Sequence, residues 1–373
     1  MQFKLIMLLF LFISLSSESF VSAKVVMIFP KDSILYYMRK VADKEIQEFT
    51  INSKNIPQTD WQNAVMYAGY IALKQLGNNK KYDDFLYGIG ENNNWNTGMH
   101  RFFADDYCVA QMYAQMYMQH HEQKMIAYWK PLADSIVQHQ FTEQLEVIPQ
   151  INYREWAWCD ALFMGPPALA YLSTALNDRK YLKKADSLWW KTTSYLYDTS
   201  ENLFYRDSRF FNRREANGQK VFWSRGNGWV MGGLVRMIDN MSTKFLNKKK
   251  YVSLFQQMAK RVKALQQPDG SWHASLLDPA FYKEKETSGT ALFCYALAWG
   301  IRKGFLNKKE YLPAVNNAWK ALMAAVHPDG LLGYVQKVGD KPTATDYNST
   351  GAYGIGAFLL PGVRYINYIN YKF

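Results

Sequence analysis

Two kinds of apolar segment alternate along the chain. One kind is amphipathic: the stretches that open at Tyr181, Tyr251 and Tyr311 carry Lys, Asn and Gln on one side and apolar residues on the other. The other kind is apolar nearly all round, as in residues 232–235 and 291–297. An amphipathic helix faces solvent on one side, whereas a helix that is apolar on every side is buried. The pattern therefore predicts solvent-facing helices that alternate with buried ones.

An internal repeat supports this alternation. The stretch that opens at Tyr251 ends in Gln-Pro-Asp-Gly at 267–270, and the one that opens at Tyr311 ends in His-Pro-Asp-Gly at 327–330. Both landmarks recur after 60 residues, and a looser copy covers residues 181–198. A fixed period of this size is the signature of stacked helical units.

The buried segments begin with polar residues, and there are six of them. Their starts are Asp60, Asp105, Asp160, Arg225, Glu286 and Ser349. With six amphipathic partners, the first over residues 32–49 and capped by Asp32 or Ser33, the pattern predicts an all-α fold, an (α/α)6 barrel. In such a barrel the starts of the inner helices gather at one end. The polar residues expected to face a common cavity there are Asp60, Asp105, Asp106, Asp160, Arg225, Thr287, Ser349 and Thr350.

The first 23 residues have the pattern of a secretory signal peptide. A basic start over residues 1–4 is followed by an apolar run over 5–15 and a small-residue cleavage site at 21–23. The apolar run is shorter than the roughly 18 residues that a membrane span requires, and no Cys follows it that would carry a lipid anchor. We therefore expect cleavage after Ala23 and export to the periplasm or the medium. Residues 24–373 would form a single barrel domain without a membrane anchor.

Composition and charge narrow the classes of function. Hydrophobic residues make up 49% and charged residues 20% of the chain, which excludes a disordered protein. The net charge of +12 indicates an acidic partner. The expected export and the scattered positions of Lys and Arg argue against nucleic acid, so we expect an acidic polysaccharide fragment. Cys108, Cys159 and Cys294 are too few for a disulfide framework and are predicted to be buried packing residues, with one disulfide as the alternative.

Two carboxylate positions lie in aromatic surroundings. One is the pair Asp105 and Asp106, and the other is Asp160, which follows Trp156-Ala-Trp158-Cys159. Apolar walls disfavour the charged form of a carboxyl and raise its pKa, which makes it a usable general acid near neutral pH. A second carboxylate nearby completes the pair that glycoside chemistry uses. The alternative is that each Asp only caps its helix, and capping is the role that we favour for Asp60.

Arg225 is a second candidate for substrate contact. It stands between Trp223 and Trp229 on a Gly-rich turn into a buried segment. A guanidinium can bind a carboxylate through two parallel hydrogen bonds, and Trp faces can stack on a sugar ring. The alternative is an internal salt bridge to an Asp.

Neither a metal nor an organic cofactor is expected. The six His residues show no HExxH or other metal-ligand spacing. The sequence contains no P-loop, no nucleophile elbow and no complete GxGxxG motif, and Gly354-Ile355-Gly356 is predicted to be a helix-packing contact.

The chain resembles a known family along nearly all of its predicted mature length. The resemblance rests on four runs, which are Trp158-Cys-Asp-Ala-Leu-Phe-Met164, Trp223-Ser-Arg-Gly-Asn-Gly-Trp229, Glu286-Thr-Ser-Gly289 and Gly351-Ala-Tyr-Gly-Ile-Gly-Ala-Phe-Leu-Leu360. They are similar to the unsaturated rhamnogalacturonyl hydrolases of glycoside hydrolase family 105, which are related to the unsaturated glucuronyl hydrolases of family 88. The resemblance implies an (α/α)6 barrel, which the repeat predicts independently.

The resemblance also implies a reaction. Enzymes of this family remove a 4,5-unsaturated uronic acid from the non-reducing end of lyase-generated oligosaccharides, such as those from pectin and rhamnogalacturonan. An Asp protonates C4, water adds at C5, and the resulting hemiketal opens and releases the neighbouring sugar. Asp160 matches the acid/base of the family, and Asp105 best matches the second Asp because a small residue, Ala110, follows five positions later. Asp106 remains the alternative.

Arg225 and Trp229 match substrate-binding positions of the family. One departure concerns a Tyr-His pair that contacts substrate in many members, because this chain has Tyr205-Arg206 there. The departure bears on which uronide or neighbouring sugar is bound. The further residues expected to contact substrate are Trp158, Trp223, Arg206, Asp106, Thr287, Ser288, Asp60 and Trp61.

Three alternatives stand beside this hypothesis. The first is an unsaturated glucuronyl hydrolase that acts on other acidic glycans. The second is an inverting hydrolase that cuts intact glycosidic bonds with Asp105 and Asp160. The third is a non-catalytic protein that binds acidic glycans through its Trp and Arg side chains.

Overall fold

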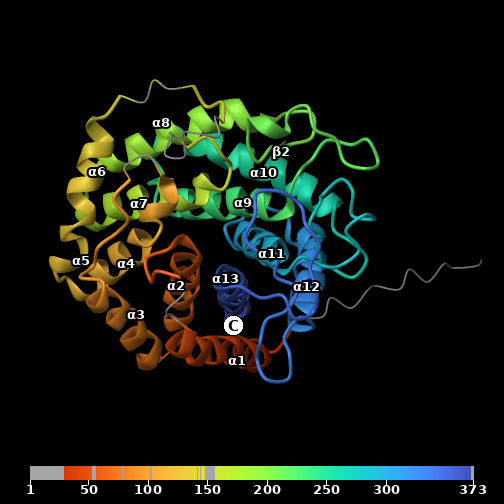
Figure 1. Ribbon diagram of the computed structural model, residues 1–373, viewed down its shortest axis with the longest axis horizontal. Helices are drawn as coiled ribbons and strands as arrows, with labels where there is room; N and C mark the ends of the chain where they lie inside the picture. Colours follow the sequence, from red (N-terminus) through yellow and green to blue (C-terminus); the bar gives the residue numbers. More distant parts are fainter. Residues whose placement is uncertain are drawn as a thin grey trace, which may run out of the picture.

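Two concentric rings of helices make up the structure (Figure 1). The structure is a computed structural model that describes residues 29–52, 56–77, 79–100, 103–140, 142, 144–147 and 156–370. Within these ranges the six inner helices are α2 (Trp61–Lys74), α4 (Ala110–His120), α7 (Ala161–Leu176), α9 (Ser224–Asp239), α11 (Thr287–Arg302) and α13 (Ala352–Asn370). Each packs against the next, and α13 packs against α2, so the ring is closed. The predicted (α/α)6 barrel is confirmed.

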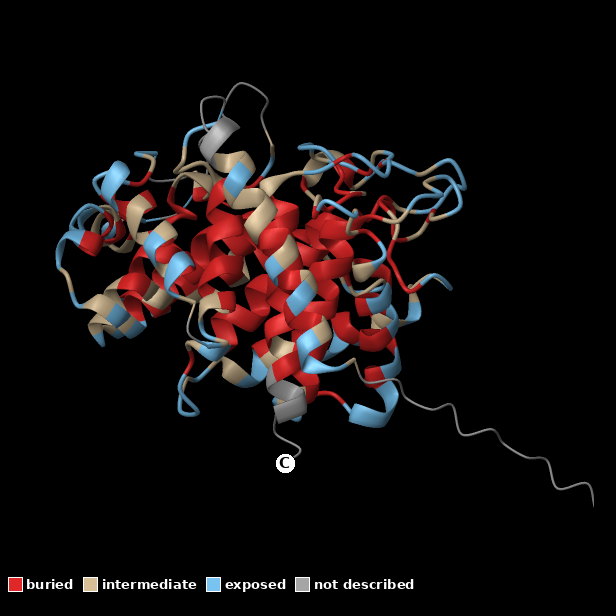
Figure 2. Cartoon of the chain, turned by 90° about the horizontal axis from the view of Figure 1, so that it is seen from below, coloured by how far each residue is buried: buried red, intermediate tan, exposed pale blue. Residues whose placement is uncertain are grey.

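Six outer helices cover the inner ring. Among the described residues they are α1 (Lys31–Asn52), α3 (Lys80–Asn92), α6 (Trp129–Gln138), α8 (Arg179–Leu196), α10 (Lys248–Ala264) and α12 (Lys308–Met323). Short elements lie in the connections, namely η1 (Ala104–Tyr107), α5 (Lys124–Ala127), η2 (Ser208–Phe210) and the antiparallel strands β1 (Tyr197–Asp198) and β2 (Leu203–Phe204). Buried residues fill the inner helices, and exposed residues occupy the outer faces and the loops (Figure 2).

The repeated Pro-Asp-Gly turns follow the outer helices α10 and α12, and each contacts the next outer helix around the barrel. Gly270 and Gly330 have φ angles of +87° and +99°, which side chains rarely adopt. A Cβ on Gly270 would lie 2.3 Å from the carbonyl oxygen of Asn317 in α12, and one on Gly330 would lie 2.8 Å from that of Lys40 in α1. The 60-residue repeat therefore marks two equivalent contacts around the barrel, and both require glycine.

Glycine also allows α2 and α13 to approach closely. A Cβ on Gly356 would lie 2.1 Å from the carbonyl oxygen of Val65, and one on Gly69 would lie 2.7 Å from the carbonyl oxygen of Gly356. The predicted packing role of Gly354-Ile355-Gly356 is confirmed for Gly356. This contact joins the last inner helix to the first.

Two helix starts differ from the predicted ones. Helix α1 begins at Lys31 because the carbonyl of Pro30 accepts a hydrogen bond from the Ile34 N–H, so Asp32 and Ser33 lie in the first turn and do not cap it. Asp105 belongs to the 3-10 turn η1, in which the Cys108 N–H donates to its carbonyl, and α4 begins only at Ala110. The carboxylates at this position are therefore presented by a tight turn that precedes the inner helix.

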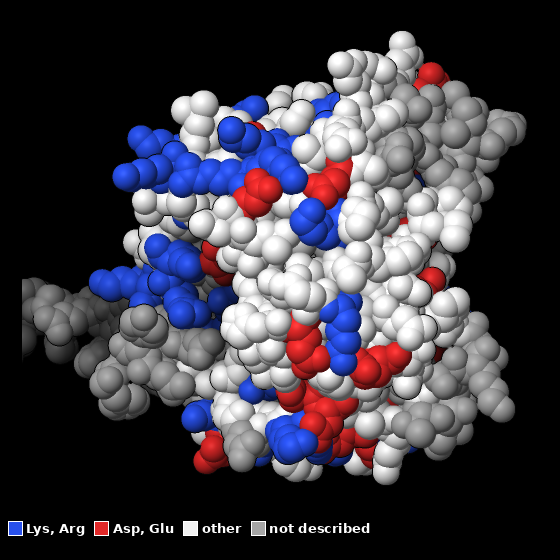
Figure 3. Space-filling model, turned by 90° about the vertical axis from the view of Figure 1, so that its left-hand side faces the viewer, with Lys and Arg blue, Asp and Glu red and all other residues white. Residues whose placement is uncertain are grey.

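Many surface charges are paired along the outer helices. On the side of the molecule seen in Figure 3, Lys and Arg stand beside Asp and Glu over much of the surface, and a larger group of Lys and Arg follows one edge. Lys130 and Lys180 both reach Asp134, at 2.9 and 2.8 Å, and Lys80 reaches Asp84 at 2.6 Å. Exposed pairs of this kind contribute little stability.

The three cysteines are free and buried, as predicted. Within the described part of the chain, no helix has both the length and the apolar run that a membrane crossing needs. The predicted signal peptide lies outside the described residues.

Candidate functional site

The polar starts of the inner helices meet the η1 turn. Asp60 precedes α2, Asp160 precedes α7, and Arg225 lies in the first turn of α9. The charges of Asp160, Asp60 and Arg206 all act on the Asp105 carboxyl and shift its pKa. Segments more than 100 residues apart in sequence therefore contribute to one site.

Asp105 and Asp160 form a carboxyl pair that is largely removed from water. Each has an Oδ1 atom that is sealed from solvent and has no hydrogen-bond partner among the described residues. Burial and the charge of Asp160 raise the pKa of Asp105 to about 8. Burial also raises the pKa of Asp160, although Arg206 and Arg225 act in the opposite direction. Two such carboxyls titrate together, so the pair keeps a proton near neutral pH.

A chain of alternating charges holds the Asp160 carboxyl in place. Asp160 Oδ2 accepts a hydrogen bond from Arg206 Nε at 3.1 Å, and Arg206 Nη1 donates to Asp207 Oδ2 at 2.7 Å. Asp207 is fully buried and also accepts from Arg209 Nε and Nη2 at 2.9 and 2.7 Å. Arg209 Nη2 reaches Asp340 as well, at 2.7 Å, in the connection between α12 and α13. Arg206, predicted to contact substrate, is thus placed directly on the candidate acid.

Asp106 points away from this pair. Its Oδ2 accepts from the backbone N–H of His100 at 2.9 Å and lies 2.6 Å from His100 Nδ1. Its backbone carbonyl accepts from the Gly98 N–H at 2.7 Å. Asp106 therefore fixes the turn around residues 98–100, and of the two alternatives it is Asp105 that lies near Asp160.

Arg225 is engaged within the protein. Its guanidinium lies between the rings of Trp223 and Tyr353, at 4.5 and 4.8 Å from their centroids. It donates to the carbonyl oxygens of Gln336 and Lys337 and to the hydroxyl of Tyr353, and Arg225 is only 1% exposed. The alternative prediction, a salt bridge to an Asp, is not formed among the described residues, because these three oxygens are the partners of the guanidinium. Arg225 instead holds the connection before α13 against the site.

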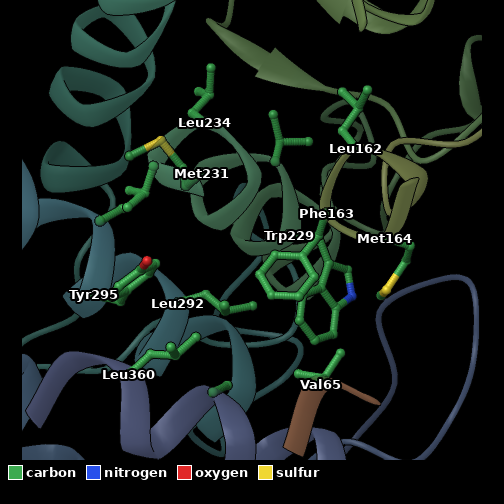
Figure 4. Close-up of a cluster of buried hydrophobic side chains, with 14 of the residues drawn as sticks. Val65, Leu162, Phe163, Met164, Trp229, Met231, Leu234, Leu292, Tyr295 and Leu360 are labelled. Atoms are coloured by element: carbon green, nitrogen blue, oxygen red, sulfur yellow. The ribbon is translucent and has the colours of Figure 1, made fainter. Parts of the chain in front are cut away.

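Two of the tryptophans that were predicted to stack on a sugar are buried. Trp229 is 1% exposed and packs 5.0 Å from Phe163 in the cluster drawn in Figure 4. Trp223 is also buried, and its indole N–H donates to Gln336 Oε1 at 2.9 Å. Trp229 faces the barrel core, whereas Trp223 lies against Gln336 and the Arg225 guanidinium.

The other two tryptophans are more exposed than Trp223 and Trp229. Trp61 is partly exposed and lies 5.2 Å from the ring of Tyr353. Trp158 is 8% exposed and lies 5.7 Å from the ring of Phe103. Tyr353 itself was not predicted from the sequence, although its position two residues into the Gly351–Leu360 run was a usable signal.

Three further candidates have structural roles. The Thr287 hydroxyl donates to the carbonyl oxygen of Gly333 at 2.8 Å, and the Ser288 hydroxyl donates to Glu286 at 2.6 Å. Both residues are buried, and their hydroxyls are used within the protein. Asp60 caps α2 by accepting from the Gln62 N–H at 2.9 Å, as favoured from the sequence. Glu286 was missed as a cap: it accepts from the N–H groups of Ser288 and Gly289.

We expect Asp105→Asn to remove a source of pH-dependent instability. The folded state holds the Asp105 pKa near 8, whereas an unfolded chain restores it to about 3.9. The stability that this group contributes is therefore complete below about pH 4 and is lost as the pH rises through about 8, by at most about 1.4 kcal/mol per pH unit. Urea unfolding at pH 5 and pH 8 should show a larger loss for the wild type than for the variant. Equal losses in the two proteins would contradict this account of Asp105.

The comparisons with known proteins agree with this fold. The sequence model of a family described as Glycosyl Hydrolase Family 88 matches residues 37–369. A curated relative from Formosa agariphila, named unsaturated 3S-rhamnoglycuronyl hydrolase, is 35% identical over 314 residues, which cover 82% of this chain and 83% of the relative.

Two solved structures are similar over almost the whole chain. A protein from Bacteroides vulgatus named glycosyl hydrolase family 88 is 30% identical with a TM-score of 0.81, over 91% of this chain and 100% of its own. A structure named polysaccharide lyase is 29% identical with a TM-score of 0.82, over 92% of this chain and 99% of its own.

Proposed function

The chain belongs to glycosyl hydrolase family 88, and on that basis we propose that it removes a 4,5-unsaturated uronic acid from the non-reducing end of oligosaccharides made by polysaccharide lyases. It is a glycoside hydrolase. The observation that carries the proposal is the buried pair of Asp105 and Asp160, which retains a proton near neutral pH beside Arg206.

The pair supports hydration of the double bond. Asp160 delivers the proton that the pair holds to C4, and the positive charge that develops at C5 and the ring oxygen is neutralised by the Asp160 carboxylate. Arg206 stabilises that carboxylate through the Nε contact at 3.1 Å. Water adds at C5 and returns a proton to Asp160. The resulting hemiketal opens, and the hemiacetal left at C1 releases the neighbouring sugar as an alcohol.

The neighbouring sugar that we propose is a 3-sulfated rhamnose. The name of the Formosa agariphila relative supports it, and the net charge of +12 suits an anionic oligosaccharide. The pectin-type disaccharide, in which unsaturated galacturonic acid precedes unsulfated rhamnose, is the alternative that the sequence motifs suggest.

The test follows the ultraviolet absorbance of the substrate double bond. Purified protein is incubated separately with the sulfated unsaturated glucuronyl-rhamnose, its unsulfated form, and unsaturated galacturonyl-rhamnose. We expect the absorbance to fall fastest with the sulfated disaccharide and to remain constant with Asp160→Asn. A rise in absorbance on an intact acidic polysaccharide would indicate lyase activity instead, and binding without any absorbance change would favour a non-catalytic glycan-binding protein.

We also propose that the protein is exported after removal of residues 1–23. The support is the sequence pattern of a basic start, an apolar run and the Val21-Ser22-Ala23 cleavage site. N-terminal sequencing of the exported protein should begin at Lys24.

A further inference from the structure

A cavity of about 370 Å³ lies beside the candidate site, between α1 and the starts of α2 and α13. Asn63 and Gly351 line it. A Cβ on Gly351 would lie 3.0 Å from the ring of Tyr353, which is itself 5.2 Å from the ring of Trp61. The cavity therefore opens at the same end of the barrel as Asp105 and Asp160. Its volume is sufficient for a small ligand.

The main polar group in this cavity has no partner. Glu45 is half-buried, and among the described residues it has neither a hydrogen-bond donor nor a cation. Two tyrosine hydroxyls of α2 do not reach it, since Tyr67 donates to the carbonyl of Gln58 at 2.9 Å and Tyr70 to that of Ala42 at 2.7 Å. Burial and the charge of Glu48 raise the pKa of Glu45 to about 7. A carboxyl left in this state has unused capacity to accept hydrogen bonds from a ligand.

The remaining charges of the cavity disfavour an anion. Lys44 lines it but is held by Glu48 at 3.0 Å and by Asp329 at 3.2 Å. Two carboxylates therefore contact this one lysine, and Glu45 adds a third carboxyl to the cavity. A sulfate or a uronate would meet net negative charge, whereas the hydroxyls of an uncharged sugar would find acceptors.

An apolar wall completes the site. Phe49 and Ile56 line the cavity, and Ile56 is 37% exposed. The C–H face of a pyranose packs well against an aromatic ring, while its hydroxyls require carboxyl or amide partners such as Glu45 and Asn63. The combination of ring, carboxyl and amide is suited to one sugar unit.

We propose that this cavity is a subsite for one uncharged sugar unit of oligosaccharides longer than the disaccharide, with Glu45 and Phe49 as the residues that select it. The inference rests on the proposed function, because it deepens the substrate preference of the same site. The enzyme would then favour oligosaccharides that carry a neutral sugar beyond the cleaved linkage over those that carry a second uronate or sulfate there.

The test compares kcat/KM for three unsaturated substrates: the disaccharide, a longer oligosaccharide with a neutral sugar beyond it, and one with an anionic sugar at that position. We expect the neutral form to be processed at least about fivefold more efficiently than the other two, equivalent to about 1 kcal/mol. Glu45→Gln and Phe49→Ala should each remove that advantage and leave kcat/KM for the disaccharide unchanged. The matched controls, Asp186→Asn and Phe245→Ala, lie outside the cavity and should keep the advantage.

Two results would overturn the inference. One is a wild-type enzyme with no preference for the neutral form. The other is an equal loss of kcat/KM on all three substrates in Glu45→Gln, an isosteric change chosen to preserve folding.

Saturation-transfer NMR with methyl xyloside gives a readout that needs no activity: binding should be present in the wild type and lost in Glu45→Gln. If no unsaturated substrate is consumed at all, the proposed function fails, and the NMR result alone decides whether the cavity binds a neutral sugar.

Discussion

Asp160→Asn is expected to lower turnover of the unsaturated disaccharide by about 10²- to 10⁴-fold, the range that one general acid contributes. Asn has nearly the same shape as Asp and can still accept a hydrogen bond from Arg206 Nε, which lies 3.1 Å from Asp160 Oδ2. What it lacks is the proton that hydration of the double bond requires. The measurement is the rate of loss of ultraviolet absorbance at saturating substrate.

The control for this variant is its folding. The circular dichroism spectrum should match that of the wild type. The free energy of unfolding in urea should differ from the wild-type value by less than about 1 kcal/mol, because the change removes a carboxyl whose burial is itself unfavourable. A folded Asp160→Asn enzyme with a rate near that of the wild type would contradict the assignment of Asp160. If the Asp160→Asn protein still binds the disaccharide but does not convert it, Asp160 has a catalytic role and is not needed for binding.

Asp207→Asn is expected to destabilise the protein by about 3 kcal/mol, the cost of removing one partner from a buried charge pair. Asp207 has no exposed side-chain surface and serves both Arg206 and Arg209. Without it, two neighbouring guanidinium groups lose their shared anion, and Arg206 is no longer fixed on Asp160. Urea unfolding at pH 7 measures the first effect, and kcat for the disaccharide measures the second.

Asp340→Asn is the matched control, since Asp340 binds the same Arg209 but its side chain is 39% exposed. We expect it to cost less than about 1 kcal/mol, as exposed ion pairs do, and to leave kcat close to that of the wild type. Similar losses in Asp207→Asn and Asp340→Asn would show that burial of Asp207 is not the source of its effect. A stable Asp207→Asn protein with normal kcat would refute its role in positioning Arg206.

The stabilising contribution of Asp207 also has a defined pH dependence. Arg209 and Arg206 overcome the cost of burial and hold the pKa of Asp207 below its ordinary value. A carboxyl with a lowered pKa in the folded state contributes stability above its unfolded pKa, and loses it as the pH falls through the folded value. The difference between wild type and Asp207→Asn should therefore shrink in acid.

The sequence by itself determined the barrel. Helical periodicity distinguishes buried from half-exposed helices locally, and the turns at Gly270 and Gly330 repeat because both need a backbone conformation that only glycine adopts easily. The six polar helix starts then predict that Asp60, Asp105 and Asp160 lie at the same end of the barrel.

Tertiary structure alone decided which way the side chains of the site point. Asp105 and Asp106 are neighbours in one 3-10 turn, and their different directions send one towards Asp160 and the other to His100. No local pattern distinguishes them, because both have the same chemistry and almost the same sequence surroundings.

The partners of the arginines also lie far away in sequence. Arg225 binds the carbonyl of Gln336 across 111 positions, and Arg209 binds Asp340 across 131. A guanidinium beside two tryptophans fits a substrate carboxylate as well as it fits backbone carbonyls, so its sequence neighbours cannot reveal which it meets. Helix periods and polar starts follow from local chemistry, whereas the contacts of a buried charge follow from which distant segment the closed ring places beside it.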